Sequence, residues 1–437
     1  MQGAAPRAPG AVELREDAPL KAAAGAGAGA GGGCCAGGPR LILACFAALS
    51  AAITLALFTQ IYYGDYEVVP HGSVASSAAA CSRAGTDALK AGGRALDAAA
   101  AAALCLAVAA PHATSLDASG AMVYWEYRRL RTQQPLLAEW GGAAGAVGAE
   151  GARPPRLVAA LAALHAELGA LPWPRLLQPA IDLARNGFPV SESLAAALAA
   201  EAPPVGSLST APQLAAYLEA LQLNTSAELV AAWGAGAVRV AAPAQGAAGA
   251  ARVFAGGARA PLALRALAAA LEPPPGSLEA AQARVVDALV SGGAGAGEAT
   301  EPRGAASGLA VVDRLDTYLA LVTGLSVPFG SGPATEAGWT RDAPARALDL
   351  APAIMADARV CGTRYVLGAE SGAALAQAAA ALAAGGGAPA VERARVVLPG
   401  AGPEPPSGAP AVNLVQQTAD ALLSHADSRG GGLASRF

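Results

Sequence analysis

The first pattern in the chain is an uninterrupted apolar stretch. Residues 41–61 carry no formal charge and are rich in Leu, Ile, Ala and Phe. A helix of this length, at about 1.5 Å per residue, spans about 30 Å, which matches the hydrocarbon core of a bilayer. No small-residue cleavage site follows it, which argues against a secretory signal peptide, and Tyr62, Tyr63 and Tyr66 fit an interfacial aromatic belt. The pattern predicts one transmembrane helix.

The residues on either side of this stretch predict its orientation. Arg40 precedes it, whereas Asp65 and Glu67 follow it, so the distribution of basic residues favours a cytosolic N-terminal side. Residues 1–40 are rich in Gly and Ala and contain no aromatic side chain, which predicts a disordered cytosolic tail. We therefore expect a single-pass type II membrane protein, with a signal-anchor helix and with residues 68–437 extracellular or lumenal.

Beyond residue 68 the chain alternates between helical and strand patterns. Small and apolar residues at helical spacing, ended by Gly or Pro, predict helices over 78–91, 94–109, 155–167, 175–185, 191–200 and 412–425. Runs of β-branched and aromatic residues predict strands over 121–127, 309–313, 318–323 and 393–398. Pro- and Gly-rich joints bracket two further helical stretches within 234–306. This order predicts an α+β fold, in which helices cover a sheet.

Two of these strands are expected to pair with each other. A short polar turn at 314–317 joins 309–313 to 318–323. Antiparallel pairing would bury alternate residues of both runs, such as Leu309 and Leu321, on one face of the sheet. We predict that they lie side by side in a central sheet.

The composition of the chain argues against nucleic-acid binding and against a metal site. The apolar fraction of 54% consists largely of Ala, and only 4% of residues are aromatic, so the packed core is smaller than the 437 residues suggest. A formal net charge of -4 and scattered Arg residues exclude a basic face for nucleic acid. The four His residues are isolated, and no motif with metal-ligand spacing occurs. We predict no metal site and no cofactor.

The outer part of the chain has few cysteines and one glycosylation sequon. Cys81, Cys105 and Cys361 cannot all pair within one chain, and the sequence does not indicate which two do. Asn224 begins an Asn-Thr-Ser sequon after a helical stretch, which predicts a surface glycan if this region is lumenal.

Four blocks, taken in order, resemble the gamma-glutamyltransferases, also called glutathione hydrolases, and within that family its divergent membrane-anchored members. They cover about a quarter of the chain. They are AACSRAGTDALKAGGRALDAAAAAALCLAVAAPHAT (79–114), LPWPRLLQPAIDLARNGFPVSESLAAALA (171–199), LAVVDRLDTYLALVTGLSVPFGSG (309–332) and YVLGAESGAALAQA (365–378). The resemblance implies an N-terminal-nucleophile hydrolase-like αββα sandwich, with residues 68–305 similar to the family's large subunit and 306–437 to its small subunit.

The resemblance also implies a reaction. The family precursor cuts itself before a Thr, and that Thr then attacks the gamma-glutamyl amide of glutathione and passes the acyl group to water or an amino acid. This chemistry needs a hydroxyl activated by its own α-amine, donors for the oxyanion, and cationic groups for the glutamyl carboxylate. Glutathione or other gamma-glutamyl compounds are therefore the expected small-molecule partners, and the sequence names no protein partner.

The family's site residues are only partly matched. Ala306 stands where the nucleophilic Thr belongs, and Ser307, one position later, is the candidate substitute nucleophile. Ser326 matches the strand-end Asn that contacts substrate. Ser371 and Gly372 match the oxyanion Gly-Gly pair, where backbone amides can still donate.

Two further blocks of the family site are changed. Residues 116–120 replace the family's triple glycine, and no block with the carboxylate-binding Arg follows the strand at 121–127, so Arg128, Arg129 or Arg131 would have to substitute for it. We therefore expect that glutathione hydrolysis and gamma-glutamyl transfer are weak or lost. The alternatives are transfer through Ser307, and a binding or assembly scaffold that uses the inherited fold without catalysis.

Overall fold

The computed structural model describes residues 38–63, 71–129, 133–141, 153–292, 304–359, 362–392 and 410–437. The chain divides into two compact units, Met1–Glu67 and Val68–Phe437. The predicted strand at 393–398, Arg131 and Cys361 lie outside the described residues.

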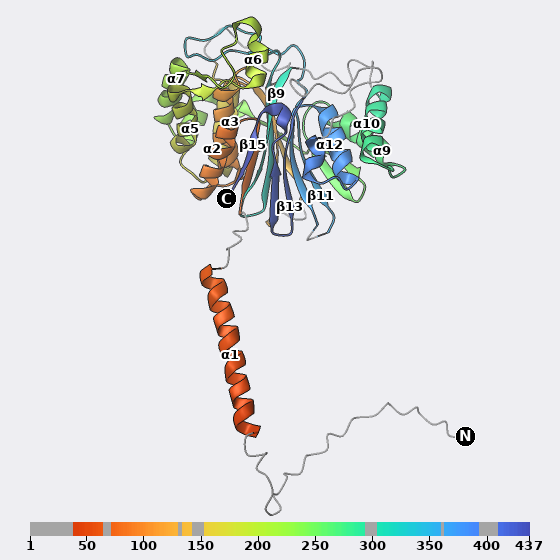
Figure 1. The fold of residues 1–437 in the computed structure, drawn as a ribbon. Coiled ribbons are helices and arrows are strands. Elements are labelled where there is room, and N and C mark those ends of the chain that lie inside the picture. The colour runs from red at the N-terminus through yellow and green to blue at the C-terminus, as the bar shows by residue number, and fades with distance from the viewer. Residues whose placement is uncertain are drawn as a thin grey trace, which may run out of the picture. The chain divides into compact units, whose positions relative to one another are not determined.

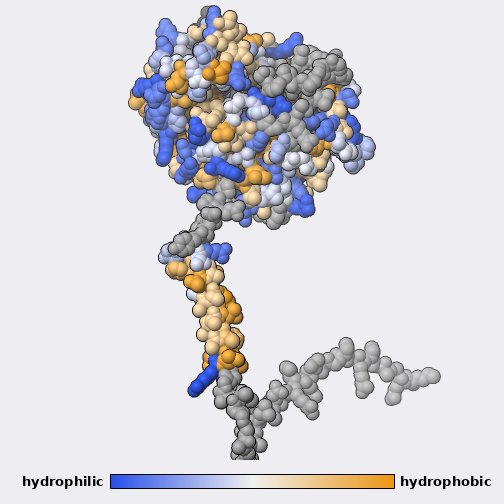
Figure 2. All heavy atoms as spheres, viewed as in Figure 1, coloured by the Kyte–Doolittle hydropathy of each residue, from blue (hydrophilic) through white to orange (hydrophobic). Residues whose placement is uncertain are grey.

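The described part of the first unit is a single helix, α1 (Gly38–Tyr63). Within it, Arg40–Gln60 is long and apolar enough to cross a membrane, and none of this stretch is buried by other parts of the protein. Figure 2 shows apolar side chains along the length of the helix. The helix predicted over 41–61 is therefore confirmed, and its length and composition are those of a membrane span.

The second unit is an αββα sandwich, as the resemblance implies (Figure 1). Its first sheet has seven strands in the order β15-β1-β9-β10-β2-β3-β6, and every neighbouring pair is antiparallel. The strands are β1 (Ser73–Ser76), β2 (Ser119–Glu126), β3 (Leu136–Trp140), β6 (Arg239–Ala241), β9 (Ala305–Val312), β10 (Thr317–Leu325) and β15 (Leu433–Arg436).

The second sheet has six strands in the order β14-β13-β12-β11-β8-β7, again antiparallel throughout. A separate two-stranded pair joins β4 (Phe188–Pro189) to β5 (Leu208–Ser209). The strands of the second sheet are β7 (Ala244–Ala248), β8 (Ala251–Ala255), β11 (Ala351–Asp357), β12 (Arg364–Ala369), β13 (Val412–Thr418) and β14 (Ala421–His425).

Helices cover the outer face of each sheet, and three apolar layers hold the sandwich together. One core lies between the first sheet and its helices, a second between the second sheet and its helices, and a third between the two sheets. The helices are α2 (Ala79–Lys90), α3 (Ala95–Ala109), α4 (Arg156–Leu168), α5 (Trp173–Asn186), α6 (Glu192–Leu198), α7 (Pro212–Gln222) and α8 (Ser226–Trp233) on the first sheet, and α9 (Ala260–Leu271), α10 (Leu278–Gly292) and α12 (Gly372–Ala383) on the second.

The predicted pairing of β9 with β10 is confirmed. Leu309 lies opposite Leu321, and Val311 opposite Leu319. All four side chains are fully buried in the core beneath the helices. Their neighbours Ala310 and Val312 point to the other face and pack between the two sheets, as the alternation of a strand requires.

The helix predicted over 412–425 is wrong, because this segment forms β13 and β14. Both faces of β13 are covered, because Val412 and Leu414 pack beneath the helices whereas Val415 packs between the two sheets. A strand buried on both faces shows no clean alternation, and its short apolar run can be mistaken for part of a helix. Ala419 has a positive φ of 51° and makes the turn between the two strands. Strands β6, β7 and β8 were not predicted either, since their Ala- and Gly-rich sequences carry little β signal.

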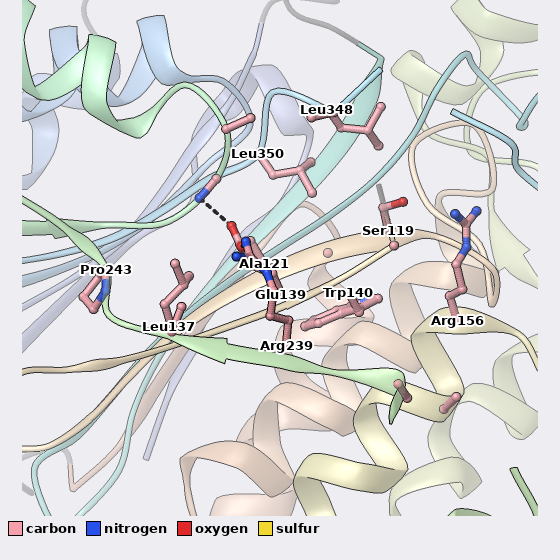
Figure 3. A pocket seen from close by; sticks show the side chains of 18 of the residues that line it. Ser119, Ala121, Leu137, Glu139, Trp140, Arg156, Arg239, Pro243, Leu348 and Leu350 are labelled. Carbon is pink, nitrogen blue, oxygen red and sulfur yellow. Dashed lines mark hydrogen bonds and ion pairs between the residues drawn. The ribbon is translucent and has the colours of Figure 1, made fainter. Parts of the chain in front are cut away.

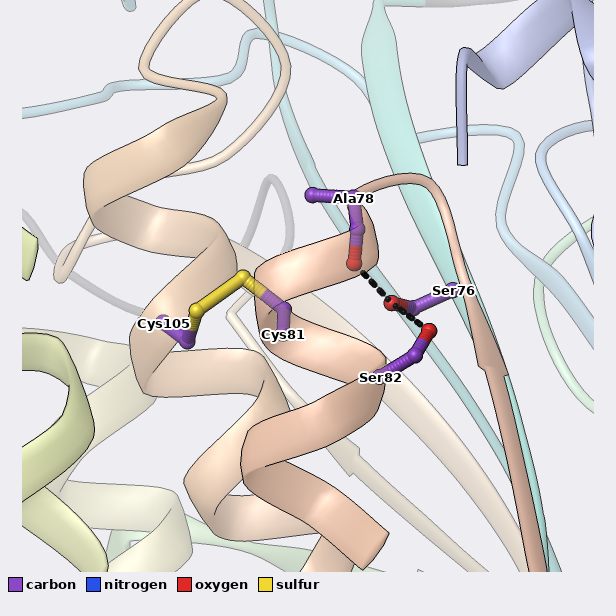
Figure 4. The surroundings of a disulfide bond; sticks show 5 residues. All are labelled: Ser76, Ala78, Cys81, Ser82 and Cys105. Atoms are coloured by element: carbon purple, nitrogen blue, oxygen red, sulfur yellow. Dashed lines mark hydrogen bonds between the residues drawn. A yellow bond between two sulfur atoms is a disulfide. The ribbon is translucent and has the colours of Figure 1, made fainter. Parts of the chain in front are cut away.

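A disulfide joins Cys81 in the first turn of α2 to Cys105 in α3, which settles the pairing that the sequence leaves open (Figure 4). Next to it, the Ser76 hydroxyl donates to the carbonyl oxygen of Ala78 at 3.1 Å and lies 2.8 Å from the hydroxyl of Ser82. The start of α2 is therefore fixed both by a covalent bond and by hydrogen bonds.

Candidate active site

The first residues of β9 include Ala306 and Ser307, the two residues that the sequence resemblance relates to the family's nucleophile. Ala306 lies opposite Gly324 and Ser307 opposite Thr323. Both residues line a cavity of about 690 Å³. We call this cavity the β9 pocket. Its polar lining consists mainly of Ser77, Arg83, His112, Ser307, Glu370 and Arg429.

The side chain of Ala306 packs in an apolar cluster. Its partners are Ala121, Val322, Leu348 and Leu350. The fit is close: a Cβ added at Gly324 would lie only 2.9 Å from Cδ2 of Leu350. Leucine side chains therefore fill the space beside Ala306.

Ser307 faces the opposite side of the sheet, towards the helices, because successive side chains of a strand alternate. It is 1% exposed, and its hydroxyl has no hydrogen-bond partner among the described residues. The imidazole of His112 lines the same pocket, and burial lowers its pKa to about 4. At neutral pH this imidazole is uncharged.

A polar network borders the pocket next to β9. The carboxylate of Glu370 accepts a hydrogen bond from the Ser77 hydroxyl at 3.2 Å and one from the amide of Ala411 at 2.8 Å. The side-chain amide of Asn413 donates to Ser77 at 3.1 Å and to the carbonyl oxygen of Gly308 at 2.7 Å. Burial raises the pKa of Glu370 to about 7. Sequence reasoning missed this network because its members lie on strands or loops far apart in the chain.

The predicted oxyanion donors make internal contacts. Ser371 caps α12, where its side chain accepts from the amide of Ala374 at 3.1 Å. The amide of Gly372 donates to Oδ1 of Asp349 at 2.9 Å, and Asp349 also pairs with Arg259 at 3.3 Å. The Gly372 amide, which the resemblance assigns to the oxyanion, therefore already donates its hydrogen to the buried carboxylate of Asp349.

Ser326 is similarly bound by a carboxylate. Its amide donates to Asp342 at 2.9 Å, and its hydroxyl contacts both Asp342 and Ser331. The amide of Asp342 in turn donates to Oδ2 of Asp117 at 3.0 Å. This residue matched to a substrate contact is thus part of a network inside the protein.

Asp117 is the centre of that network. It lies in the segment that replaces the family's triple glycine, and it is 1% exposed. Its carboxylate pairs with Arg153 at 2.7 Å and with Arg156 at 3.2 Å. It also accepts the backbone amides of Arg156 and Asp342. Two arginines and two amides therefore neutralise one buried charge.

Arg128 and Arg129 do not substitute for the missing carboxylate-binding arginine. They follow β2, whose last residue pairs with Thr317 at the opposite end of the sheet from Ala306. The length of β9 separates the two ends by about 20 Å. Arg128 instead pairs with Asp316 at 2.6 Å, and Arg129 with Glu126 at 3.5 Å. The hypothesis of a substitute on these residues is therefore wrong.

A second cavity, of about 1130 Å³, opens beside β3 (Figure 3). Its wall is mostly Ala, Leu, Pro and Gly, and it includes Leu348 and Leu350 of the cluster around Ala306. Ser119 and Trp140 also line it, as does Glu139, which pairs with Arg239. Arg153 and Arg156 line it as well, so the cavity has both an apolar wall and charged groups, and the two leucines lie between this cavity and Ala306.

Comparison with known proteins agrees with this architecture. The family model described as gamma-glutamyltranspeptidase matches residues 81–228. Glutathione hydrolase 7 of Bos taurus is 33% identical in an alignment of 241 residues that covers 48% of this chain and 35% of the relative. Glutathione hydrolase 6 of Bos taurus is 43% identical over 134 residues, which are 31% of this chain and 26% of the relative. The alignments span about a third of the length of these curated relatives.

The fold is also similar to that of a solved structure. A cephalosporin acylase from Bacillus halodurans superposes with a TM-score of 0.63, covering 84% of this chain and 96% of that chain at 17% sequence identity. This similarity concerns the fold alone. In sequence, residues 81–228 match the gamma-glutamyltranspeptidase family, and the two relatives show that parts of the chain are similar to glutathione hydrolases, from which it has diverged.

Proposed function

We propose that this protein is a membrane-anchored gamma-glutamyltransferase-like protein in which glutathione hydrolysis and gamma-glutamyl transfer are weak or lost. The observation that carries the proposal is the environment of Ala306. A methyl group packed against Leu348 and Leu350 stands where the reaction needs a hydroxyl. The fold then serves to bind or assemble with a partner rather than to turn over glutathione.

The contacts of the other matched residues support the same proposal. An oxyanion near Gly372 would compete with the carboxylate of Asp349 for one amide, and the two negative charges would repel each other. Ser307 lies on the face of β9 opposite to Ala306, so its hydroxyl cannot take the place of a side chain at position 306. Both the nucleophile and the donor are therefore compromised.

The expected result is that the full-length protein stays a single uncut chain and releases no measurable product from a gamma-glutamyl anilide. Intact-mass analysis and the colorimetric assay measure these two properties. Ala306→Thr alone should not restore turnover, because the Gly372 amide remains bound to Asp349. Two fragments joining at the Ala306–Ser307 bond, with hydrolysis abolished by Ser307→Ala, would show an active enzyme.

We further propose a type II orientation, with residues 68–437 outside the cytosol. Helix α1 supplies a span, and the disulfide between Cys81 and Cys105 fits an oxidising compartment. Asn224 lies in the turn between α7 and α8, where it is only partly covered. A glycan can therefore be attached there without disturbing the core.

Endoglycosidase treatment of the cell-expressed protein is expected to increase its gel mobility, whereas Asn224→Gln should already migrate at the faster position and should not respond. Asn186→Gln, which removes an asparagine outside any sequon, is the matched control and should behave like wild type. A shift that persists in Asn224→Gln would place the glycan elsewhere.

A further inference from the structure

We propose that the β9 pocket binds a small organic acid. The first turn of α2, Arg83 and Ser307 would bind the carboxylate of this acid, and the apolar residues that line the pocket would contact the rest of it. Such a site goes beyond the function proposed above, because binding there needs no turnover. None of the residues matched to the family's substrate contacts takes part in it, whereas Ser307, the candidate substitute nucleophile, does.

The first turn of α2 supplies backbone donors to the pocket. Ala78, Ala79 and Ala80 all line it, and α2 is 12 residues long. The amides of Cys81 and Ser82 donate to the carbonyl oxygen of Ala78 at 3.0 Å, so the amides of Ala79 and Ala80 are the ones left at this helix start. The N-cap residue Ala78 has no side chain that could accept from them. Amides at a helix start, together with the helix dipole, favour an anion.

Ser307 supplies a second donor beside the first. Ser76 pairs with Leu309, so the residues after β1 run alongside the first residues of β9. The Ser307 hydroxyl is buried in the pocket lining and makes no hydrogen bond to the described part of the chain. A buried hydroxyl without a partner is costly, and a ligand oxygen in the pocket would satisfy it.

The charges around the pocket favour an acid over an amine. Arg83 is exposed and has no ion-pair partner among the described residues. Arg429, by contrast, pairs with Asp427 at 2.9 Å. The carboxylate of Glu370 already accepts from Ser77 and Ala411, and its raised pKa of about 7 leaves it partly neutral. Arg83 is therefore the cation that remains for a ligand.

The rest of the pocket determines the body of the ligand. Leu183, Phe188, Val190 and Pro328 form apolar parts of the wall. A volume of about 690 Å³ falls within the range of small-molecule sites. An acid with an aromatic or short aliphatic body fits both the donors and the wall, whereas the polar body of a peptide would leave its own amides unpaired.

The disulfide makes this site rigid before any ligand arrives. Cys81 lies in the first turn of α2 and is bonded to α3, and Ser76 holds the carbonyl oxygen of Ala78 (Figure 4). Donors that are already fixed lose little entropy when a ligand binds. A ligand should therefore bind more tightly to these fixed donors than to the same donors on a flexible loop.

The test is a ligand titration of the protein in nanodiscs, in which ligand-observed NMR measures binding. The probe is phenylacetate, and phenylacetamide is its uncharged counterpart. We expect phenylacetate to bind saturably and phenylacetamide to bind at least about tenfold more weakly, because charge-assisted hydrogen bonds are lost. Arg83→Gln should weaken phenylacetate by about three- to tenfold and reduce the difference between the two probes, because Arg83 is an exposed cation and the α2 amides and Ser307 remain.

Lys90→Gln is the matched control, since it removes one positive charge from the exposed last turn of the same helix and should leave binding unchanged. Ser307→Ala, which removes only a hydroxyl, should weaken phenylacetate several-fold. Absence of saturable phenylacetate binding, equal affinity for both probes, or an equal loss in Lys90→Gln would overturn the proposal. Chain cleavage is measured separately on the same samples, so this outcome is independent of whether the protein proves to be catalytic.

Discussion

Asp117→Ala is expected to lower the free energy of unfolding by about 3–5 kcal/mol, because it leaves two arginines in a partly buried site without their counter-charge. The side chains of Arg153 and Arg156 are 25% and 12% exposed, so water can replace only part of the lost interaction. The amides of Arg156 and Asp342 would lose their acceptor as well. The same substitution should also make Ser326 more mobile. Asp117 accepts the amide of Asp342, and the carboxylate of Asp342 in turn binds Ser326.

Denaturant unfolding followed by tryptophan fluorescence measures this loss. Asp87→Ala is the matched control: its carboxylate is 69% exposed and pairs with Lys90 at 3.4 Å. Removal of such a surface pair should cost less than about 1 kcal/mol. Equal losses in the two variants would mean that Asp117 does not organise the site.

Replacement of both Cys81 and Cys105 by Ala is expected to lower the free energy of unfolding by about 3 kcal/mol. The disulfide closes a segment with a sequence separation of 24, and such a crosslink stabilises the folded state mainly by restricting the unfolded chain. Both cysteines are buried, so the small alanine side chains should leave little additional strain. The first turn of α2 should also become more mobile, which links the same bond to the β9 pocket.

Thermal unfolding with and without a reducing agent measures the effect. Wild type should lose stability when it is reduced, whereas the double variant should be destabilised already and insensitive to the reductant. Cys45→Ala, in the exposed helix α1, is the control and should respond as wild type does. A double variant as stable as oxidised wild type would show that the crosslink has no energetic role.

Local patterns were sufficient to predict much of the fold. Helices α2 and α3 end where Gly and Pro end the apolar pattern, and β9 with β10 follows from alternation and a polar turn. These signals act over a few residues, so they can be read without tertiary contacts. The segment of β13 and β14 shows the limit: its turn depends on a left-handed Ala419, a residue type that gives no sign of one.

The candidate site was predicted only in part, for a related reason. The match of Ala306 to the family's nucleophile stays a prediction, and it can be made from the sequence because it depends on one position in a strand. Asp349 bound to Gly372 and Asp117 bound to Arg153 join residues that lie far apart in the chain, and no local pattern pairs them. Arg128 was misplaced because its proximity to β2 in sequence does not say at which end of the sheet it lies.

The position of β1 in the first sheet has a mechanical consequence. This strand enters the domain between β9 and β15, and the strand that closes the sheet comes from the C-terminal end of the chain. The amide of His71 donates to the carbonyl oxygen of Phe437 at 2.6 Å, and the amide of Phe437 donates to Gly72 at 3.2 Å. A pull transmitted through the residues ahead of β1 acts along the strand, so it must shear two antiparallel ladders at once instead of peeling one edge bond by bond. A force applied ahead of β1 therefore acts on an interior strand, and the pairing of β15 with β1 shares that force between two ladders of hydrogen bonds.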